Sequence, residues 1–192
     1  MSSPKILAGT FKGVALSTLE GNETRPSTGR VTENLFNILI HNVFYDETFS
    51  FSGKNILDLC AGSGRLGLEA LSRGAKYATF IDNNPHAVTV IKKNIAKLSA
   101  EDKTDIHTLD STKLHSKASF CPKYGPFDLI FCDAPYHTDI AEKSIQAIYQ
   151  QGWLSPKPVV VIEMSRAQKD IDLAFLEPKI IKNYGATRLV FY

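Results

Sequence analysis

The stretch NILDLCAGSGRLGLE, from Asn55 to Glu69, decides the fold of this 192-residue chain. It opens with the apolar run Ile56–Cys60, which is short and bounded by small residues, as a buried parallel strand should be. Glycines follow, and the apolar residues after them begin a helical pattern. A strand, a glycine turn and a helix together present backbone N–H groups and a helix N-terminus to a ligand. The stretch therefore predicts an α/β sheet with a ligand site at this turn.

The spacing Gly62-x-Gly64-x-x-Gly67 matches the fingerprint of proteins that bind dinucleotides. Glycine is needed there because the turn is tight and the ligand approaches the backbone closely. Asp82 lies 20 residues beyond Gly62, where an acid that binds ribose is expected. The spacing fits NAD as well as S-adenosylmethionine (SAM), and it also fits a turn that only packs a helix against a strand.

Composition places the chain among ordinary globular proteins. Its content of 43% hydrophobic and 22% charged residues suits one domain with a modest appendage. No apolar run reaches the roughly 18 residues of a membrane span, and the first residues lack the apolar core of a signal peptide. We therefore expect a soluble cytoplasmic protein, and a monomer.

The cysteines and histidines indicate no metal site. Cys60, Cys121 and Cys132 form no C-x-x-C pair, and the five histidines are scattered along the chain. Cys60 and Cys132 end apolar strands, where cysteine usually packs as a small hydrophobic residue. We expect neither a disulfide framework nor a bound metal.

The positive charge of the chain is concentrated near its start. Residues 1–30 hold four Lys or Arg side chains against two Glu, which accounts for the whole formal net charge of +2. A polyanion-facing arm would have this excess. A solvated surface segment would show the same excess, so charge alone does not choose between them.

Strand and helix patterns alternate after the glycine turn, which predicts a doubly wound parallel sheet. A helix should begin at Asn84-Pro85, with Asn84 as its cap. The short connection at Tyr184-Gly185 predicts a closing antiparallel hairpin, which is expected of SAM-dependent methyltransferases more than of NAD domains. Further strands are predicted at 76–81, 105–109, 127–132, 158–163, 179–183 and 188–192, and helices at 30–44, 111–118, 138–151 and 166–175. Residues 5–19 should form a hairpin or a pair of short strands.

The tetrapeptide Asp133-Ala134-Pro135-Tyr136 follows the fourth core strand, at the edge that faces the glycine turn. The Asp133 carboxylate can accept a hydrogen bond from an exocyclic amine, and Pro135 favours an extended Ala134 whose carbonyl can accept another. Tyr136 offers a flat face on which a base can stack. Two acceptors would favour the tetrahedral amine that carries a lone pair. A loop that caps the next helix and packs its tyrosine is the structural alternative.

This tetrapeptide resembles the D-P-P-Y motif of SAM-dependent methyltransferases that act on exocyclic amines. Beyond it, nearly the whole chain resembles the RsmD family, the bacterial 16S ribosomal RNA guanine-N2 methyltransferases. The segments that carry the resemblance are Gly9, Lys12-Gly13, the stretch from Arg25 to Asn37, Leu57 to Gly64, Gly67 to Ala70, and Tyr184 to Thr187.

The resemblance implies a class I methyltransferase fold, a Rossmann-like sheet. It divides the chain into an RNA-facing β extension (1–29) and a methyltransferase domain (30–192). The turn from Asp58 to Gly64 would hold the methionine end of SAM, Asp82 the ribose and Asp110 the adenine amine. The cofactor-binding residues implied are Asp58, Cys60, Ala61, Gly62, Ser63, Gly64, Asp82, Asn83, Asp110 and Ser111; the catalytic ones are Asp133, Ala134, Pro135 and Tyr136; the RNA-binding ones are Lys12, Arg25, Thr28 and Arg30.

Two positions depart from the family pattern. Ala134 replaces the usual first proline of the motif but keeps the backbone carbonyl, so we expect a less rigid loop and retained activity. Gly29 stands where the family usually has an acid, which leaves the role of the preceding loop open.

The implied reaction is in-line transfer of the SAM methyl group to N2 of a guanine in small-subunit rRNA, with no metal. Three rivals stay open: methylation of adenine N6 or glutamine N5, a non-catalytic SAM-binding RNA module, and an NAD-dependent oxidoreductase. The N-terminal arm argues against the first, and the retained Asp133 and Tyr136 argue against the second. Against the third, no catalytic His, Tyr-x-x-x-Lys or metal group is evident. The sequence leaves open which guanine is modified and whether the substrate is naked rRNA or an assembled subunit.

Overall fold

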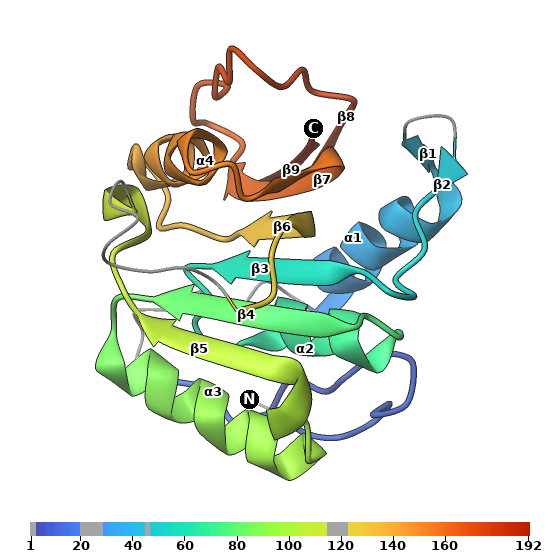
Figure 1. The fold of residues 1–192 in the computed structure, drawn as a ribbon. Helices are drawn as coiled ribbons and strands as arrows, with labels where there is room; N and C mark the ends of the chain where they lie inside the picture. Colours follow the sequence, from blue (N-terminus) through green and yellow to red (C-terminus); the bar gives the residue numbers. More distant parts are fainter. Residues whose placement is uncertain (1–2, 20–28, 45–46, 115–122) are drawn as a thin grey trace.

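The computed structural model describes residues 3–19, 29–44, 47–114 and 123–192. These segments form one seven-stranded sheet covered by helices, with a two-stranded ribbon beside it (Figure 1). The strands are β1 Val43–Phe44, β2 Glu47–Thr48, β3 Asn55–Leu59, β4 Tyr77–Asp82, β5 Thr104–Thr108, β6 Phe127–Cys132, β7 Leu154–Ser165, β8 Ile180–Tyr184 and β9 Thr187–Phe191. The helices are α1 Gly29–His41, α2 Arg65–Ser72, α3 Pro85–Leu98 and α4 Ile140–Gln150, with short 3-10 helices η1 Glu101–Lys103 and η2 Ser111–Lys113.

The strand order is β5-β4-β3-β6-β7-β9-β8. The first five strands of this order are parallel, whereas β9 is antiparallel to both β7 and β8. Because β3 pairs with β4 on one side and β6 on the other, the chain changes direction across the sheet at β3. Ligands of doubly wound sheets bind at such a switch point, beyond the carboxyl ends of the strands. The doubly wound sheet and its closing hairpin confirm the predicted fold class.

The two faces of the sheet have separate apolar cores. Alternate residues of a strand point to opposite faces, so Phe80 belongs to the core that contains residues of α1, α2 and α3, whereas its neighbour Ile81 belongs to the core that contains residues of α4. The predicted start of α3 is confirmed: the helix begins at Pro85, and Asn84 caps it by accepting a hydrogen bond from the His86 N–H at 2.9 Å. Within the described residues, no helix is both long and apolar enough to cross a bilayer.

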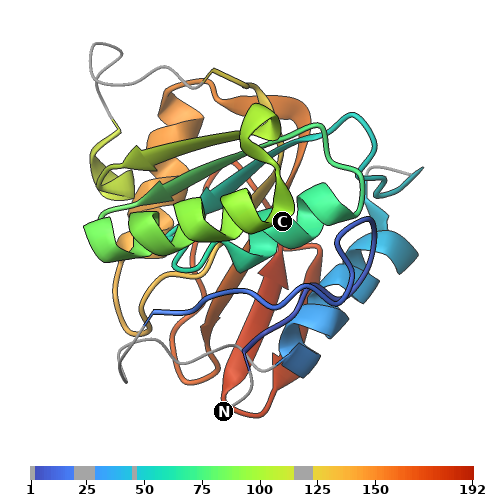
Figure 2. The ribbon, with the colours of Figure 1, turned by 90° about the horizontal axis from the view of Figure 1, so that it is seen from below.

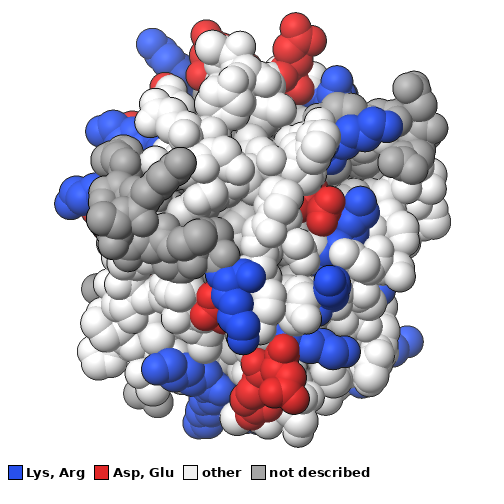
Figure 3. Space-filling model, viewed as in Figure 1, with Lys and Arg blue, Asp and Glu red and all other residues white. Residues whose placement is uncertain are grey.

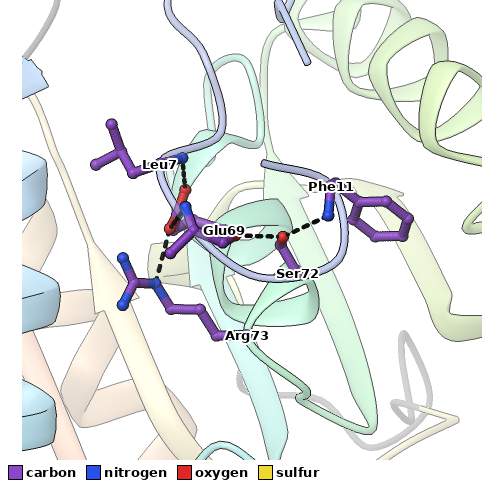
Figure 4. A network of polar contacts seen from close by, with 6 residues as sticks. Leu7, Phe11, Glu69, Ser72 and Arg73 are labelled. Carbon is purple, nitrogen blue, oxygen red and sulfur yellow. Dashed lines mark hydrogen bonds and ion pairs between the residues drawn. The ribbon is translucent and has the colours of Figure 1, made fainter. Parts of the chain in front are cut away.

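The N-terminal segment, residues 3–19, runs across α2 and α3 (Figure 2). The carboxylate of Glu69, only 1% exposed, accepts hydrogen bonds from the Leu7 N–H at 2.7 Å and the Ala8 N–H at 3.1 Å. Ser72 Oγ accepts the Phe11 N–H at 2.9 Å, as Figure 4 shows. The predicted hairpin is reduced to a single antiparallel bridge between Lys5 and Ala15.

Some element boundaries differ from prediction. The first helix ends at His41 rather than at residue 44, and the strand predicted at 158–163 spans 154–165. In the described part of the helix predicted at 111–118, residues 111–113 form a 3-10 turn. Residues 20–28 and 115–118 lie outside the described residues.

The helix predicted at 166–175 is wrong. Side chains of the closing hairpin take the backbone carbonyls there: Arg188 donates to the Arg166 carbonyl at 3.2 Å and Tyr192 to the Ile171 carbonyl at 3.0 Å. Leu173, 3% exposed, is drawn into the core from an irregular segment. Side-chain partners from β9 and from the following Tyr192, together with the burial of Leu173, therefore override the local helical pattern.

Candidate functional site

A cavity of about 510 Å³ lies at the carboxyl ends of the parallel strands. Its volume suits a cofactor of SAM's size, because pockets for small ligands typically enclose about 300–1,000 Å³. Gly64 is not among its lining residues; a Cβ there would lie 3.3 Å from Phe80 and Ile91 of the core. The residues assigned from sequence that do line the cavity are Asp58, Cys60, Ala61, Gly62, Ser63, Asp82, Asn83, Asp110, Ser111, Asp133, Ala134, Pro135 and Tyr136.

The glycine turn is tied together by Asp58, which is 1% exposed. Its carboxylate accepts a hydrogen bond from the Gly67 N–H at 2.9 Å, which links the end of β3 to the first turn of α2. Burial raises the pKa of the Asp58 carboxyl well above its usual range. Only glycine fits at Gly67, because a Cβ there would come within 2.4 Å of the Phe80 ring. The turn therefore holds its backbone against the cavity through close packing of α2 on β4.

Asp82 lies at the tip of β4, between the glycine turn and the start of α3. One carboxylate oxygen accepts the Gly62 N–H at 2.8 Å, and the other accepts the Asn84 N–H at 2.9 Å. These bonds fix the orientation of the carboxylate. Each oxygen keeps a further lone pair, so the group can still accept hydrogen bonds from two vicinal hydroxyls.

Asp110 and Ser111 follow β5 on the same edge. Hydrogen bonds from Thr112, together with Lys113 3.0 Å away, lower the pKa of the Asp110 carboxyl to about 2. Ser111, buried, shares a 2.7 Å hydrogen bond with Ser144 of α4. The result is an acceptor that is ionised at neutral pH, on a turn that is anchored to the neighbouring helix.

The loop from Asp133 to Tyr136 forms the opposite wall of the cavity. Its tyrosine hydroxyl donates to Glu163 of β7 at 3.2 Å and lies 3.1 Å from the hydroxyl of Thr187 on β9. Burial raises the pKa of Tyr136 to about 12, so its hydroxyl stays protonated at neutral pH. The structure thus brings Asp133 and Tyr136 into one cavity with the glycine turn, as their places at the strand ends predicted.

Sequence reasoning missed Arg65 and Glu163, which both line the cavity. Burial lowers the pKa of the Arg65 guanidinium, and the negative charges of Asp133 and Glu163 oppose that shift. A signal for Glu163 was present, because a charged residue, here 5% exposed, interrupts the apolar run of β7. Arg65 is the first residue of α2 and directly follows a turn in which only the glycine spacing indicated a ligand.

The N-terminal segment reaches the same site, since Pro4, Thr18 and Leu19 line the cavity. The buried amide of Asn94 joins the segment to the glycine turn: it donates to the carbonyls of Ser17 and Ser63 at 2.9 Å each.

Among the residues assigned to RNA, Lys12 and Arg30 are exposed, whereas Arg25 and Thr28 lie outside the described residues. On the face of Figure 3, basic groups lie among acidic ones, and its described part shows no broad basic surface. Within the segments that the structure describes, no three His, Cys, Asp or Glu residues gather as metal ligands. Cys60 and Cys132 are free thiols, and Cys121 is not described.

The sequence profile of the family described as Conserved hypothetical protein 95 matches residues 4–192. The chain belongs to this family. A Haemophilus influenzae relative named Ribosomal RNA small subunit methyltransferase D is 34% identical, over 98% of this chain and 91% of its own length. The resemblance to the RsmD family is thereby confirmed.

Solved structures show the same fold. The Escherichia coli protein yhhF, named as a methyltransferase, covers 100% of this chain and 97% of its own, with a TM-score of 0.80 and 27% identity. An RNA methyltransferase from Salinibacter ruber, solved with S-adenosylhomocysteine, covers 88% of this chain and 92% of its own at a TM-score of 0.61 and 16% identity. These neighbours confirm the class I methyltransferase fold, and membership of the RsmD family removes the support for an NAD-dependent oxidoreductase.

Proposed function

We propose that this chain is a SAM-dependent methyltransferase that acts on the exocyclic N2 of a guanine in small-subunit ribosomal RNA. The observation that carries the proposal is that the loop from Asp133 to Tyr136 faces a SAM-type glycine turn across one cavity. The names of its relatives in the RsmD family support small-subunit rRNA as the substrate.

The cofactor fits along the β3, β4 and β5 side of the cavity. The turn from Asp58 to Gly64 would hold the methionine end, Asp82 the ribose hydroxyls, and Asp110 with Ser111 the adenine. The bound S-adenosylhomocysteine of the Salinibacter ruber neighbour supports a cofactor of this class. The fixed carboxylate of Asp82 and the ionised one of Asp110 are acceptors suited to hydroxyls and an amine.

The β6 and β7 side of the cavity would hold the target guanine. When bound, SAM supplies an electrophilic methyl group, so positioning accounts for most of the catalysis. The Asp133 carboxylate and the Ala134 carbonyl would accept from the guanine amine and fix its lone pair toward the cofactor side. The ring of Tyr136 would stack on the base, with its hydroxyl held by Glu163 and Thr187.

Mass spectrometry of rRNA nucleosides tests the reaction directly. Small-subunit rRNA from cells that lack this protein should lose one N2-methylguanosine, and expression of the chain should restore it. Loss of N6-methyladenosine with unchanged N2-methylguanosine would instead support a different amine. Unchanged rRNA in both strains would contradict the proposal.

Asp82→Ala is expected to weaken SAM binding by about 10- to 100-fold, because the ribose loses a charge-assisted acceptor worth roughly 1.5–3 kcal/mol. Isothermal titration calorimetry measures the change, with exposed Asp102→Ala as a control that removes the same charge from η1. Equal SAM affinity in the two variants would contradict the ribose role. Tight NADH binding without SAM binding would overturn the cofactor assignment.

The N-terminal extension (1–29) is proposed to face RNA, together with Arg30 at the start of the methyltransferase domain (30–192). Neutralising Lys12, Arg25 and Arg30 should weaken rRNA binding and flatten its salt dependence, by about 0.7–0.9 in the log–log slope for each phosphate that the protein no longer neutralises. Binding is measured at several salt concentrations. The charge-matched control neutralises the exposed Lys92, Lys93 and Lys103. An unchanged slope in the Lys12, Arg25 and Arg30 variant would mean that the N-terminal extension is ordinary surface and does not contact RNA.

A further inference from the structure

The loop that faces the cofactor turn is held a second time, beyond Tyr136. The side-chain amide of Gln168 accepts a hydrogen bond from the His137 N–H at 3.0 Å and donates one to the Thr138 carbonyl at 3.2 Å. The Thr138 hydroxyl in turn donates to the Pro135 carbonyl at 2.7 Å, which closes the loop on itself. One side chain therefore pairs with the loop backbone in both directions, as a neighbouring strand would.

His137 needs such support. Its φ of 62° is in the left-handed region, which costs a residue with a Cβ roughly 1–2 kcal/mol. Conformations of this kind persist only where the surroundings determine them. The Gln168 side chain hydrogen-bonds the N–H of His137 and the carbonyl of Thr138, so it holds the backbone on both sides of the strained position.

Gln168 is itself fixed to the end of β7. Its N–H donates to the Ser165 carbonyl at 3.0 Å, and the neighbouring Arg166 N–H donates to the Ala186 carbonyl at 2.8 Å. The same strand carries Glu163, which holds the hydroxyl of Tyr136. Tyr136 is thus held through its hydroxyl by side chains of β7 and β9, and the backbone of the loop is held by Gln168, in the turn that follows β7.

We propose that Gln168 is a positioning residue for methyl transfer: it locks the backbone of the 133–138 loop so that Asp133, Ala134 and Tyr136 meet the target base in one arrangement. This inference rests on the proposed function. Gln168 does not line the cavity, so its effect on the reaction passes through the loop. It is therefore expected to influence the rate and not the affinity for the cofactor.

Gln168→Ala is expected to lower the single-turnover rate by about 10- to 100-fold, because small misplacements of reacting groups have effects of that size. SAM affinity should stay within about twofold of wild type, since the β3 and β4 contacts are untouched. Gln168→Glu keeps an acceptor for the His137 N–H but has no donor for the Thr138 carbonyl, so its rate should also fall. Exposed Lys169→Ala, in the same turn, is the matched control and should keep the wild-type rate.

Hydrogen exchange of the His137 amide supplies a readout that does not depend on catalysis. Exchange should speed up in Gln168→Ala and not in Lys169→Ala. Unchanged exchange, or a wild-type rate in Gln168→Ala, would overturn the inference. A parallel fall in rate, SAM affinity and thermal stability would mean a general structural role and would overturn it too. If the wild type left rRNA unmethylated, the proposed function would fail, whereas the exchange experiment would still test the Gln168 contact.

Discussion

Asp133→Ala is expected to lower the single-turnover rate of methyl transfer to small-subunit rRNA by on the order of 100-fold or more. The change removes one of the two acceptors proposed to hold the guanine amine, while the loop anchors at Tyr136 remain. SAM affinity should change by no more than a few-fold, since the proposed cofactor contacts come from β3, β4 and the turn after β5. Transfer of labelled methyl groups and calorimetry measure the two quantities separately.

Companion variants separate the parts of this loop. Tyr136→Ala removes a stacking face worth about 1–3 kcal/mol per base and should weaken productive RNA binding, whereas Tyr136→Phe keeps that face. Ala134→Pro keeps the backbone carbonyl, so its rate should stay within a few-fold of wild type. Full activity in Asp133→Ala would refute the assigned role. Activity that appears only after Ala134→Pro would favour a non-catalytic SAM-binding module.

Gly9→Ala is expected to lower the free energy of unfolding by more than about 3 kcal/mol, above the common range for single substitutions. A Cβ at Gly9 would lie 1.8 Å from the backbone oxygen of Ser72, so the N-terminal segment would have to leave α2. That displacement would leave the buried carboxylate of Glu69 without two of its donors. Urea denaturation measures the loss.

Gly13→Ala is the matched control for Gly9→Ala. Both glycines have a left-handed φ, 81° at Gly9 and 86° at Gly13, but a Cβ at Gly13 would meet nothing within 4 Å. The free energy of unfolding of Gly13→Ala should therefore fall by only about 1–2 kcal/mol, the cost of a left-handed φ at a residue with a Cβ. Equal losses in the two variants would show that contact with Ser72 is not the cause.

The glycine turn and the sheet could be predicted because their determinants are local. Gly64 has a left-handed φ of 76°, and Gly67 allows α2 to approach Phe80 of β4, so these residues within one strand–turn–helix unit specify its shape. The alternation of strand and helix patterns then restricts the topology to a doubly wound sheet. The carboxyl ends of β3 and β6 lie side by side in that topology, so Asp133 could be placed near the turn from sequence alone.

The support of the 133–138 loop could not be predicted, because it depends on register between distant strands. Tyr136 meets Glu163 27 positions away and Thr187 51 positions away, and Gln168 contacts the loop across 31 positions. Contacts between residues so far apart leave no periodic pattern in the sequence from which they could be predicted. The helix prediction at 166–175 was wrong for the same reason, since backbone carbonyls of this segment accept hydrogen bonds from the distant Arg188 and Tyr192.

The docking of the N-terminal segment sets an order of events during synthesis. Leu7 bonds to Glu69, which is added 62 residues later, and Ser17 bonds to Asn94, which is added 77 residues later. At translation rates of about 5–20 residues per second, Ser17 waits roughly 4–15 seconds for its acceptor. Thr18 and Leu19, which follow it, line the cavity at the carboxyl ends of the parallel strands. The part of the cavity that Thr18 and Leu19 line is therefore expected to form only after α3 has left the ribosome, however early the glycine turn has folded.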